Sequence, residues 1–250
     1  MKSYRADLHV HTVLSPCAGI EMIPPLIVQE ALERGIEVIA ITDHNASANI
    51  WAVQKAAEGS GLIVLPGVEL QTREEVHALC LFDRLEQVEE FQQWIDQHLP
   101  ATRNNPDFFG EQFIVDETGD FLGREDRLLI NSVTASLSQA WEKVTALGGL
   151  LAPAHIDRQA FGLIAVLGLV PDDFPVEALE ISRHISPAEA VKRHPQIHGY
   201  PLVQSGDVHY LDGFLGSTWL RMESVSITEI RQALRGENGR GVEIRVLGQQ

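Results

Sequence analysis

Short apolar runs that alternate with helix-like segments constrain the fold of this chain most. Segments with helix signals separate several of these runs: Pro24 and Pro25 start a segment that Gly35 ends, Ser47 can cap a second, and residues 85–99 carry apolar side chains at helical spacing. Strands in alternation with helices predict an α/β fold with a parallel sheet that is wound or closed. The runs have the length of buried strands and span residues 5–11, 36–42, 62–69, 76–82, 149–154, 177–181, 201–206 and 217–222.

The 250 residues fit one domain of this kind, and two segments depart from the alternation. Residues 100–128 form an excursion in which "FIVDETGDFLG" predicts a hairpin that turns at Thr118–Gly119. With Phe108, Phe109 and Asn104–Asn105, this excursion is expected either to cover the barrel or to act as a lid. Residues 226–250 predict a helix followed by a short strand.

Charge and composition restrict the partners. A net charge of −16 argues against an extended phosphate-binding surface, so we do not expect long nucleic acid as a partner. Small phosphorylated substrates remain compatible, because bound divalent ions can reverse the local charge. No signal peptide or membrane-spanning run is found, which predicts a cytoplasmic protein without a membrane partner. The oligomeric state is not indicated.

Two cysteines are too few for a disulfide framework, so reduced thiols are expected. Cys80 lies in the apolar run "VHALCLF" and is expected to be a buried strand residue.

The first run contains two histidines, His9 and His11, two residues apart in "DLHVHT". Alternate residues of a strand share a face, so their Cβ atoms should lie about 6–7 Å apart, within reach of one ion. This pair alone is equally compatible with two partly exposed surface histidines.

The other strand ends give the pair its meaning. Six of the ten histidines lie in or directly after an apolar run, and most lie at its carboxyl end, which is where α/β barrels place their active sites. We therefore predict a metal site at that end of the sheet. The polar residues gathered there are His9, His11, Asp43, His44, Glu69, His77, His155, Asp207 and His209.

The residue types indicate the kind of metal site. Imidazole suits Zn, Mn and Fe, and carboxylates can bridge two ions about 3.5–4 Å apart. The set offers more ligands than one ion can use, so two or three divalent transition-metal ions are expected. Such a cluster activates water and holds a phosphoryl oxygen, which is the chemistry of phosphoester hydrolysis.

The motifs "DLHVHT", "ITDHN", "PGVE", "VHAL", "PAHID" and "SGDVH", in this order, resemble those of the PHP (polymerase and histidinol phosphatase) family of metal-dependent phosphoesterases. The match extends from Asp7 to about Leu220. The resemblance implies a distorted (β/α)7 TIM-like barrel with a trinuclear Zn, Mn or Fe centre at the carboxyl end of the strands. It also implies hydrolysis of phosphate mono- or diesters, here predicted for a small ester, by attack of a metal-activated water.

The resemblance also assigns the ligands of three ions. Many family members have a histidine or an acidic residue at the position of Cys17. The first ion is assigned His9, His11, Glu69 and Asp207; Glu69 bridges to the second, which His77 and His155 complete; the third takes His44, His209 and Cys17.

Four residues are predicted to take part in catalysis: the metal-binding carboxylates Glu69 and Asp207, together with Arg158 and His184. Arg158 is a candidate phosphate clamp, because a guanidinium can hold two oxygens at once, or it is a solvated loop arginine. The same choice applies to Arg183 and His184.

Other roles stay open. His184 or His209 could protonate the leaving group. Asp43 is expected to support a neighbouring ligand or to cap a helix, and Glu180 to have a structural or supporting role.

Two alternatives remain. Amidohydrolases also begin with H-x-H on a barrel strand, but they usually bridge metals with a lysine, where this chain has Glu69 and few lysines. A non-catalytic PHP module is the second alternative, and it would be expected to have lost ligands.

Overall fold

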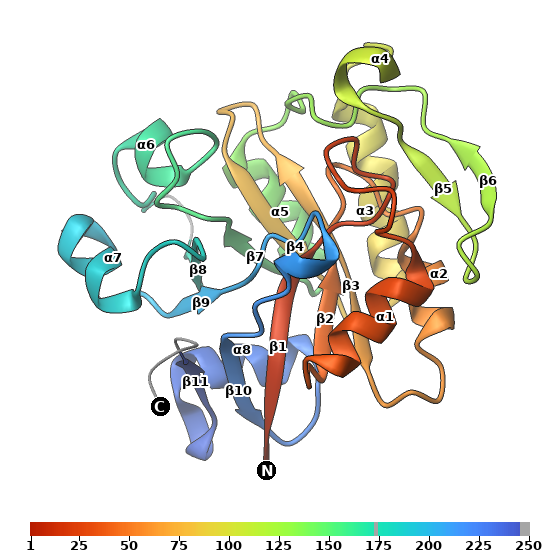
Figure 1. Ribbon diagram of the computed structural model, residues 1–250. Helices are drawn as coiled ribbons and strands as arrows, with labels where there is room; N and C mark the ends of the chain where they lie inside the picture. Colours follow the sequence, from red (N-terminus) through yellow and green to blue (C-terminus); the bar gives the residue numbers. More distant parts are fainter. Residues whose placement is uncertain (173–174, 246–250) are drawn as a thin grey trace.

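The computed structural model describes residues 1–172 and 175–245, and its centre is a curled, half-barrel sheet (Figure 1). The strand order is β11-β10-β1-β2-β3-β4-β7. A separate parallel pair is formed by β8 (Leu179–Ile181) and β9 (Leu202–Gln204), and a parallel bridge between Val10 and Val208 joins the segment after β9 to the end of β1. The sheet strands are β1 (Lys2–Val10), β2 (Val38–Ile41), β3 (Ile63–Gln71), β4 (His77–Leu81), β7 (Leu150–Pro153), β10 (Thr218–Met222) and β11 (Gly241–Ile244).

All eight predicted strands are present, but the sheet is not uniformly parallel. The strands β1, β2 and β3 run parallel, whereas β4 is antiparallel to β3 and β10 is antiparallel to β1. The expectation of a parallel sheet is wrong at these two strands. At β4 the reason is local: only residues 72–76 separate it from β3, which is enough for a hairpin but too short for a parallel crossover.

Helices cover both faces of the sheet. Most pack on the outer face, and α8 (Ile227–Arg235) packs on the inner face. The residue before α2 is Asn49, so that helix begins later than Ser47 suggested. The outer helices are α1 (Pro24–Glu33), α2 (Ile50–Ala56), α3 (Leu85–His98), α5 (Leu137–Ala146), α6 (Leu163–Leu167) and α7 (Pro187–Arg193); short 3-10 turns span 195–197, 211–213 and 237–239.

The excursion contains α4 (Pro106–Phe109) and the hairpin β5 (Phe113–Val115) and β6 (Phe121–Arg124). Gly119 at its turn has φ 88°, which glycine adopts without strain. Whether the excursion is a lid or a cover stays a prediction. Of the expected terminal strand, residues 246 and 247 lie outside the described residues.

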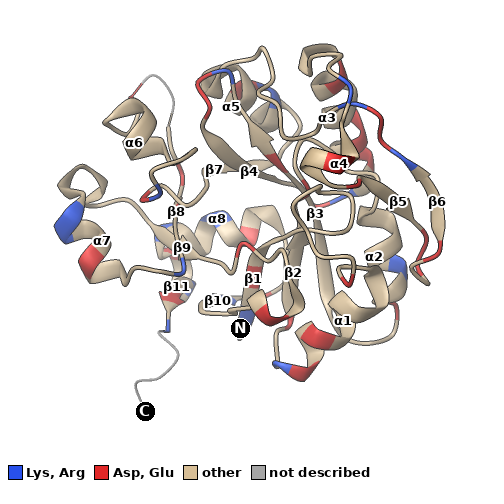
Figure 2. Ribbon diagram, turned by 45° about the horizontal axis from the view of Figure 1, so that its top comes forward, with Lys and Arg blue, Asp and Glu red and all other residues tan. Residues whose placement is uncertain are grey.

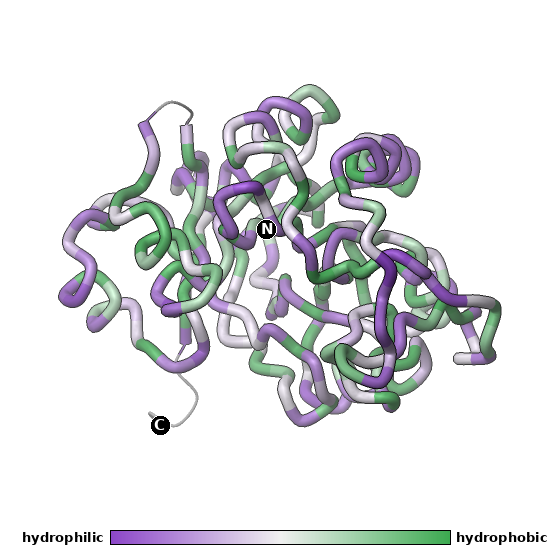
Figure 3. Tube along the Cα trace, turned by 90° about the horizontal axis from the view of Figure 1, so that it is seen from above, coloured by the Kyte–Doolittle hydropathy of each residue, from purple (hydrophilic) through white to green (hydrophobic). Residues whose placement is uncertain are grey.

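Hydrophobic and hydrophilic stretches alternate along the chain (Figure 3), and within the sheet strands this alternation defines two buried faces. On β2, Ile39 and Ile41 point outward to the helices, whereas Val38 and Ala40 point inward. The inward residues form an apolar layer, which we call the lower layer, with the buried side of α8. Its strand members are Ala6, Leu8, Val38, Ala40, Leu65, Leu79, Leu81, Leu150, Ala152, Ala154, Ala178, Val203, Leu220 and Met222.

β1 carries one extra residue, and this bulge sets the direction of its histidines. Asp7 pairs with Ile39 and Val10 pairs with Ile41, so Leu8 and His9 both stand opposite Ala40. The side chain of Asp7 accepts hydrogen bonds from three backbone amides at 206, 215 and 216. The bulge shifts the alternation by one residue, so His9 joins Leu8 on the inner face instead of following Asp7.

Within the described ranges, no helix is both long and apolar enough to cross a bilayer. The cytoplasmic location stays a prediction.

Candidate metal centre

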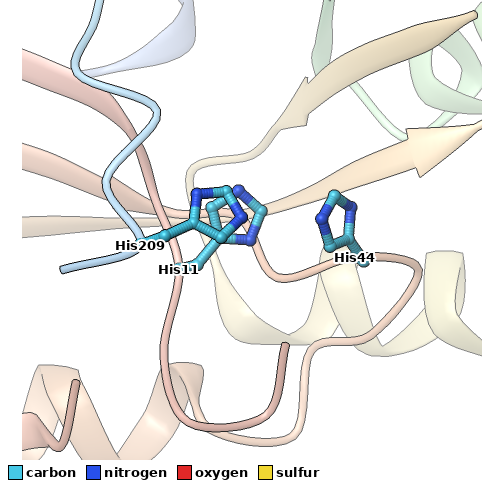
Figure 4. Close-up of side chains that lie close together, drawn as sticks. All are labelled: His11, His44 and His209. Atoms are coloured by element: carbon cyan, nitrogen blue, oxygen red, sulfur yellow. The ribbon is translucent and has the colours of Figure 1, made fainter. Parts of the chain in front are cut away.

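Above the lower layer, the carboxyl ends of the strands bring nearly all the predicted ligands together in what we call the upper layer. The imidazole rings of His9 and His11 lie 5.1 Å apart, and that of His11 lies 4.0 Å from His209 and 4.6 Å from His44, measured between ring centres. Figure 4 shows the last three rings gathered from three separate segments. The members of the upper layer are His9, His11, His44, Glu69, His77, His155, Asp207 and His209.

Glu69 is the centre of this layer, and its carboxylate is 1% exposed. Five imidazole nitrogens surround it, a density of contacts that suits a carboxylate shared by more than one cation. The Oε1 atom lies 2.8 Å from His77 Nδ1, 3.1 Å from His155 Nε2 and 3.2 Å from His9 Nε2, and Oε2 lies 3.0 Å from His44 Nδ1 and 3.3 Å from His11 Nε2.

Asp207 is the second carboxylate of the layer. Its Oδ1 atom lies 3.2 Å from His9 Nε2 and 3.3 Å from His11 Nε2, while Oδ2 receives Arg158 Nη1 at 2.6 Å. One oxygen therefore faces the histidines and the other faces an arginine at the rim.

Several of these close atoms make no hydrogen bond. Within the described parts of the chain they are buried without a partner of suitable geometry, although pairs of them lie only 3.0–3.3 Å apart. Unpaired buried polar atoms are costly, and lone pairs that converge without meeting are what a cation site requires. The residues therefore fit a cluster of divalent ions. The atoms are His9 Nε2, His11 Nε2, His44 Nδ1, Glu69 Oε2, His155 Nδ1, Glu180 Oε1 and Asp207 Oδ1.

Three groups within the layer have ligand atoms within 4.8 Å of one another. The first reproduces the ligands predicted for the first ion, whereas the other two differ by one member each from the predicted sets. They are His9, His11, Glu69 and Asp207; then His44, Glu69 and His77; and finally His11, His44 and His209.

Cys17 lies outside these groups. It is exposed, and its side chain hydrogen-bonds His44. The loop after β1 thus brings Cys17 to the edge of the layer, beside one ligand of the third predicted set.

Hydrogen bonds hold the histidines in orientation. His9 Nδ1 lies 3.0 Å from Glu180 Oε2, which also accepts the backbone N–H of His155 at 3.0 Å. His11 Nδ1 lies 2.9 Å from Ser15 Oγ, which donates to Asp43 at 2.7 Å. Each contact leaves the Nε2 atom of its histidine facing the centre.

Two of these supporting residues were not predicted. Gln71 lies 3.2 Å from His77 Nε2, and its position two residues after Glu69 on the same strand face was a usable signal. Ser15 had no signal, because its role depends on how the loop folds back onto Asp43.

Backbone strain is found at the ligands. His155 has φ 28° and Asp207 has φ 49°, both rare for residues other than glycine, and Asn45 beside His44 has φ 48°. The inward direction of Ala154 would turn His155 outward in a regular strand, and the positive φ ends that alternation.

In the ion-free centre, burial and the Glu69 carboxylate act in opposite directions. Burial disfavours the charged imidazole of His44, but Glu69 and Cys17 outweigh it and raise its pKa to about 9. For His77 burial prevails and lowers the pKa to about 4. The pKa of His209 is lowered to about 3 by burial and by neighbouring His11, so both of the latter rings are neutral near pH 7.

The remaining predicted residues lie at the rim or beyond it. Arg158 is at the rim, paired with Asp207. Arg183 donates to the carbonyl of Gly213, and exposed His184 lines a 250 Å³ cavity with it. That cavity is lined by none of the predicted ligands, so the structure does not bring His184 into the layer.

A comparison with protein families identifies this arrangement. The PHP domain model matches residues 7–155, more than half of the chain. The chain belongs to the PHP domain family.

Relatives of this PHP domain have different names and cover only part of their own length. It is 39% identical over 75 residues to the 5'-3' exoribonuclease Rnm of Salmonella typhimurium, which is 29% of this chain and 25% of the relative. It is 31% identical over 80 residues to the phosphoribosyl 1,2-cyclic phosphate 1,2-diphosphodiesterase of Eggerthella lenta, which is 30% of this chain and 29% of the relative.

The fold extends over almost the whole PHP domain. The lesion-specific endonuclease PfuEndoQ of Pyrococcus furiosus is similar with a TM-score of 0.72 and 20% identity, covering 96% of this chain and 58% of that one. A structure of endonuclease Q with a 27-mer duplex that carries an abasic lesion at the active site is similar with a TM-score of 0.69 and 20% identity, with the same coverage.

These relatives correct one prediction. The expectation that extended nucleic acid is not a partner is wrong as an argument from net charge, because an exoribonuclease and a DNA-bound endonuclease are among the relatives. Acidic and basic residues are scattered over many elements (Figure 2), and the carboxylates at the centre are counted as charge although bound cations would neutralise them. Total charge therefore does not describe the field at the site.

Proposed function

We propose that this PHP domain is a metal-dependent phosphoesterase that hydrolyses a phosphate mono- or diester, with two or three Zn, Mn or Fe ions held by the upper layer. The convergence of unpaired imidazole and carboxylate atoms around Glu69 carries the proposal. When bound, such ions neutralise a phosphoryl oxygen and lower the pKa of an attacking water. Trinuclear occupancy within a (β/α)7-type barrel is part of this proposal.

The ligands are proposed as follows from the contacts above. Glu69 is the shared carboxylate, and no lysine contacts this layer in the described residues, which disfavours the amidohydrolase alternative. The first ion takes His9, His11, Glu69 and Asp207; the second takes Glu69, His77 and His155; the third takes His44, His209 and Cys17.

Arg158 is proposed to bind a phosphoryl oxygen. Its side chain is 36% exposed and is fixed at one nitrogen by Asp207, so its other N–H groups are available at the rim. A guanidinium in this position offsets the negative charge that grows on phosphorus-bound oxygens. His184 is kept as a proposed proton donor to the leaving group, and His184→Asn tests this role by the pH profile.

The proposal is tested with protein loaded with Mn²⁺ or Zn²⁺. Hydrolysis of p-nitrophenyl phosphate and its bis-ester tests the reaction, and short 5'-phosphorylated RNA and DNA strands beside ribose 5-phosphate separate nucleic-acid ends from the small esters predicted from the sequence. We expect at least two metal ions per chain and turnover that chelation removes. Turnover of every ester at or below the level of Glu69→Gln would overturn the proposal.

A further inference from the structure

One tight loop after β7 carries three residues of interest, His155, Arg158 and Phe161. The N–H of Arg158 donates to the carbonyl of His155 at 2.9 Å, and a Cβ at Gly162 would lie 2.2 Å from the carbonyl oxygen of Arg158. Asp157 anchors the loop to Ser182, accepting from its amide and its hydroxyl at 2.6 Å each. The loop is therefore folded back on itself and held to its neighbour.

Phe161 lies against a predicted ligand. Its ring is stacked on the His77 imidazole, with centres 4.5 Å apart and planes 7° apart, and its carbonyl accepts the His77 amide at 3.0 Å. The residue is nevertheless 38% exposed and has φ 60°, which is rare for a bulky side chain. Because one side of the ring is covered by His77, the exposed part lies at the mouth of the metal centre.

A flat apolar surface and a guanidinium at one mouth match a ligand of a particular kind. Aromatic side chains stack on nucleobases through their faces, and such stacking does not depend on the base. A phosphate held near Arg158 would leave the rest of the ester beside the loop that carries Phe161. A ligand with a phosphate and a flat ring satisfies both features at once.

We propose that Phe161 is a stacking platform for the base of the substrate, so that the substrate class of this phosphoesterase is a nucleotide, either free or at the end of a nucleic-acid strand. This inference rests on the proposed function. It assigns to Phe161 a part in choosing the substrate, separate from any effect on the ions.

The test compares substrates that differ by the base alone. We would measure kcat/KM of the metal-loaded protein for AMP, GMP, CMP and UMP and for ribose 5-phosphate, and take the ratio of the best nucleotide to the sugar phosphate. Phe161→Leu keeps apolar cover over His77 but removes the flat ring, and it should lower this ratio about 5- to 100-fold, the factor that base stacking supplies. Phe161→Tyr should restore it.

Leu169→Ala is the matched control, since Leu169 is 54% exposed in the segment after α6 and contacts no ligand among the described residues. It should leave the ratio unchanged. A ratio near one in the unchanged protein, or equal losses on both substrates in Phe161→Leu, would overturn the platform. Dinucleotides added to the same series show whether a strand end is preferred over a free nucleotide.

Calorimetric dissociation constants of the same compounds separate this inference from the proposed function. Absence of turnover on every compound counts against the phosphoesterase. Nucleotides that bind the metal-loaded protein no more tightly than ribose 5-phosphate count against the platform, whatever the turnover.

Discussion

The lower and upper layers of the inner face are built on the same strands, yet their chemistry is opposite. On β3, Leu65 belongs to the apolar layer and Glu69 to the polar one, and on β4 Leu79 and His77 make the same pair. The lower layer is packed against α8, whereas the upper layer buries polar atoms without partners. An unpaired buried polar group costs free energy, so the apolar layer offsets a destabilising one directly above it. Stability and chemistry are thus assigned to different levels of one sheet.

The largest effect is expected at Glu69. Glu69→Gln keeps the shape but removes the charge shared among the cations, so metal content should fall by at least one ion per chain and kcat/KM by about 100-fold or more. Metal analysis and steady-state kinetics measure both. Glu177→Gln, which alters a carboxylate paired with Arg231 away from the centre, is the control. Activity of Glu69→Gln within about threefold of the unchanged protein would mean that the upper layer does not depend on this carboxylate.

The lower layer should respond in stability instead. Leu79→Ala opens a cavity beneath the centre and should lower the free energy of unfolding by about 2–5 kcal/mol, while the folded protein keeps its number of ions. Urea unfolding and metal analysis at low temperature check the two parts. Leu122→Ala, at a side chain 64% exposed, should change neither. Loss of ions without loss of stability in Leu79→Ala would show that the layers are not separate.

The pH dependence of the metal-free protein should reveal the charge balance of the upper layer. The pKa of His44 rises from 6.5 to about 9 on folding, so the folded state holds more protons between these values and stability falls as pH rises through them. The lowered pKa values of His77 and His209 act below pH 6.5, where the unfolded chain takes up more protons and stability falls as pH drops. The maximum should therefore lie near pH 6.5.

The alkaline limb is expected to be at most about 3 kcal/mol, at about 1.4 kcal/mol per pKa unit. Thermal unfolding of chelated protein from pH 6.5 to 9 measures it. His44→Asn should flatten this limb, and His98→Asn, whose ring hydrogen-bonds Trp94 away from the centre, should not. An equally steep limb in His44→Asn would assign the effect elsewhere.

The smallest effect is expected at Cys17, at the edge of the upper layer. Cys17→Ser should remove no more than one ion per chain and leave the other two, because Cys17 contacts only His44 among the predicted ligands. Metal titration of the variant checks this. Unchanged stoichiometry would exclude Cys17 as a ligand, and loss of two or more ions would mean that the three sites are not independent.

Much of the centre could be predicted because ligand positions follow the ends of apolar runs. The spacing of His9 and His11 and the positions of Glu69 and His77 needed only strand periodicity. The directions of β4 and β10 were not accessible in the same way, since they depend on pairing between distant segments.

Local patterns also gave no sign of the supporting contacts. The partnership of Ser15 with Asp43, the inward turn of His155 and the stacking of Phe161 on His77 depend on loop conformations. The bulge at Leu8 and His9 was equally hidden, because it is a difference in register between two strands and not a feature of either one.

The pairing of β1 with β10 has a consequence for how the centre comes into existence. Asp7 on β1 bonds amides that lie 199 to 209 residues further along the chain, and Lys2 pairs with Met222. Contacts of such sequence separation make folding slow, and until they form β1 presents an unpaired edge to other chains. The first ligand pair, His9 and His11, is synthesised early, but Asp207 joins it only when the far segment has docked. Metal capture is therefore a late event in the assembly of this molecule, and a nascent chain has to keep two exposed imidazoles and an open strand edge soluble until then.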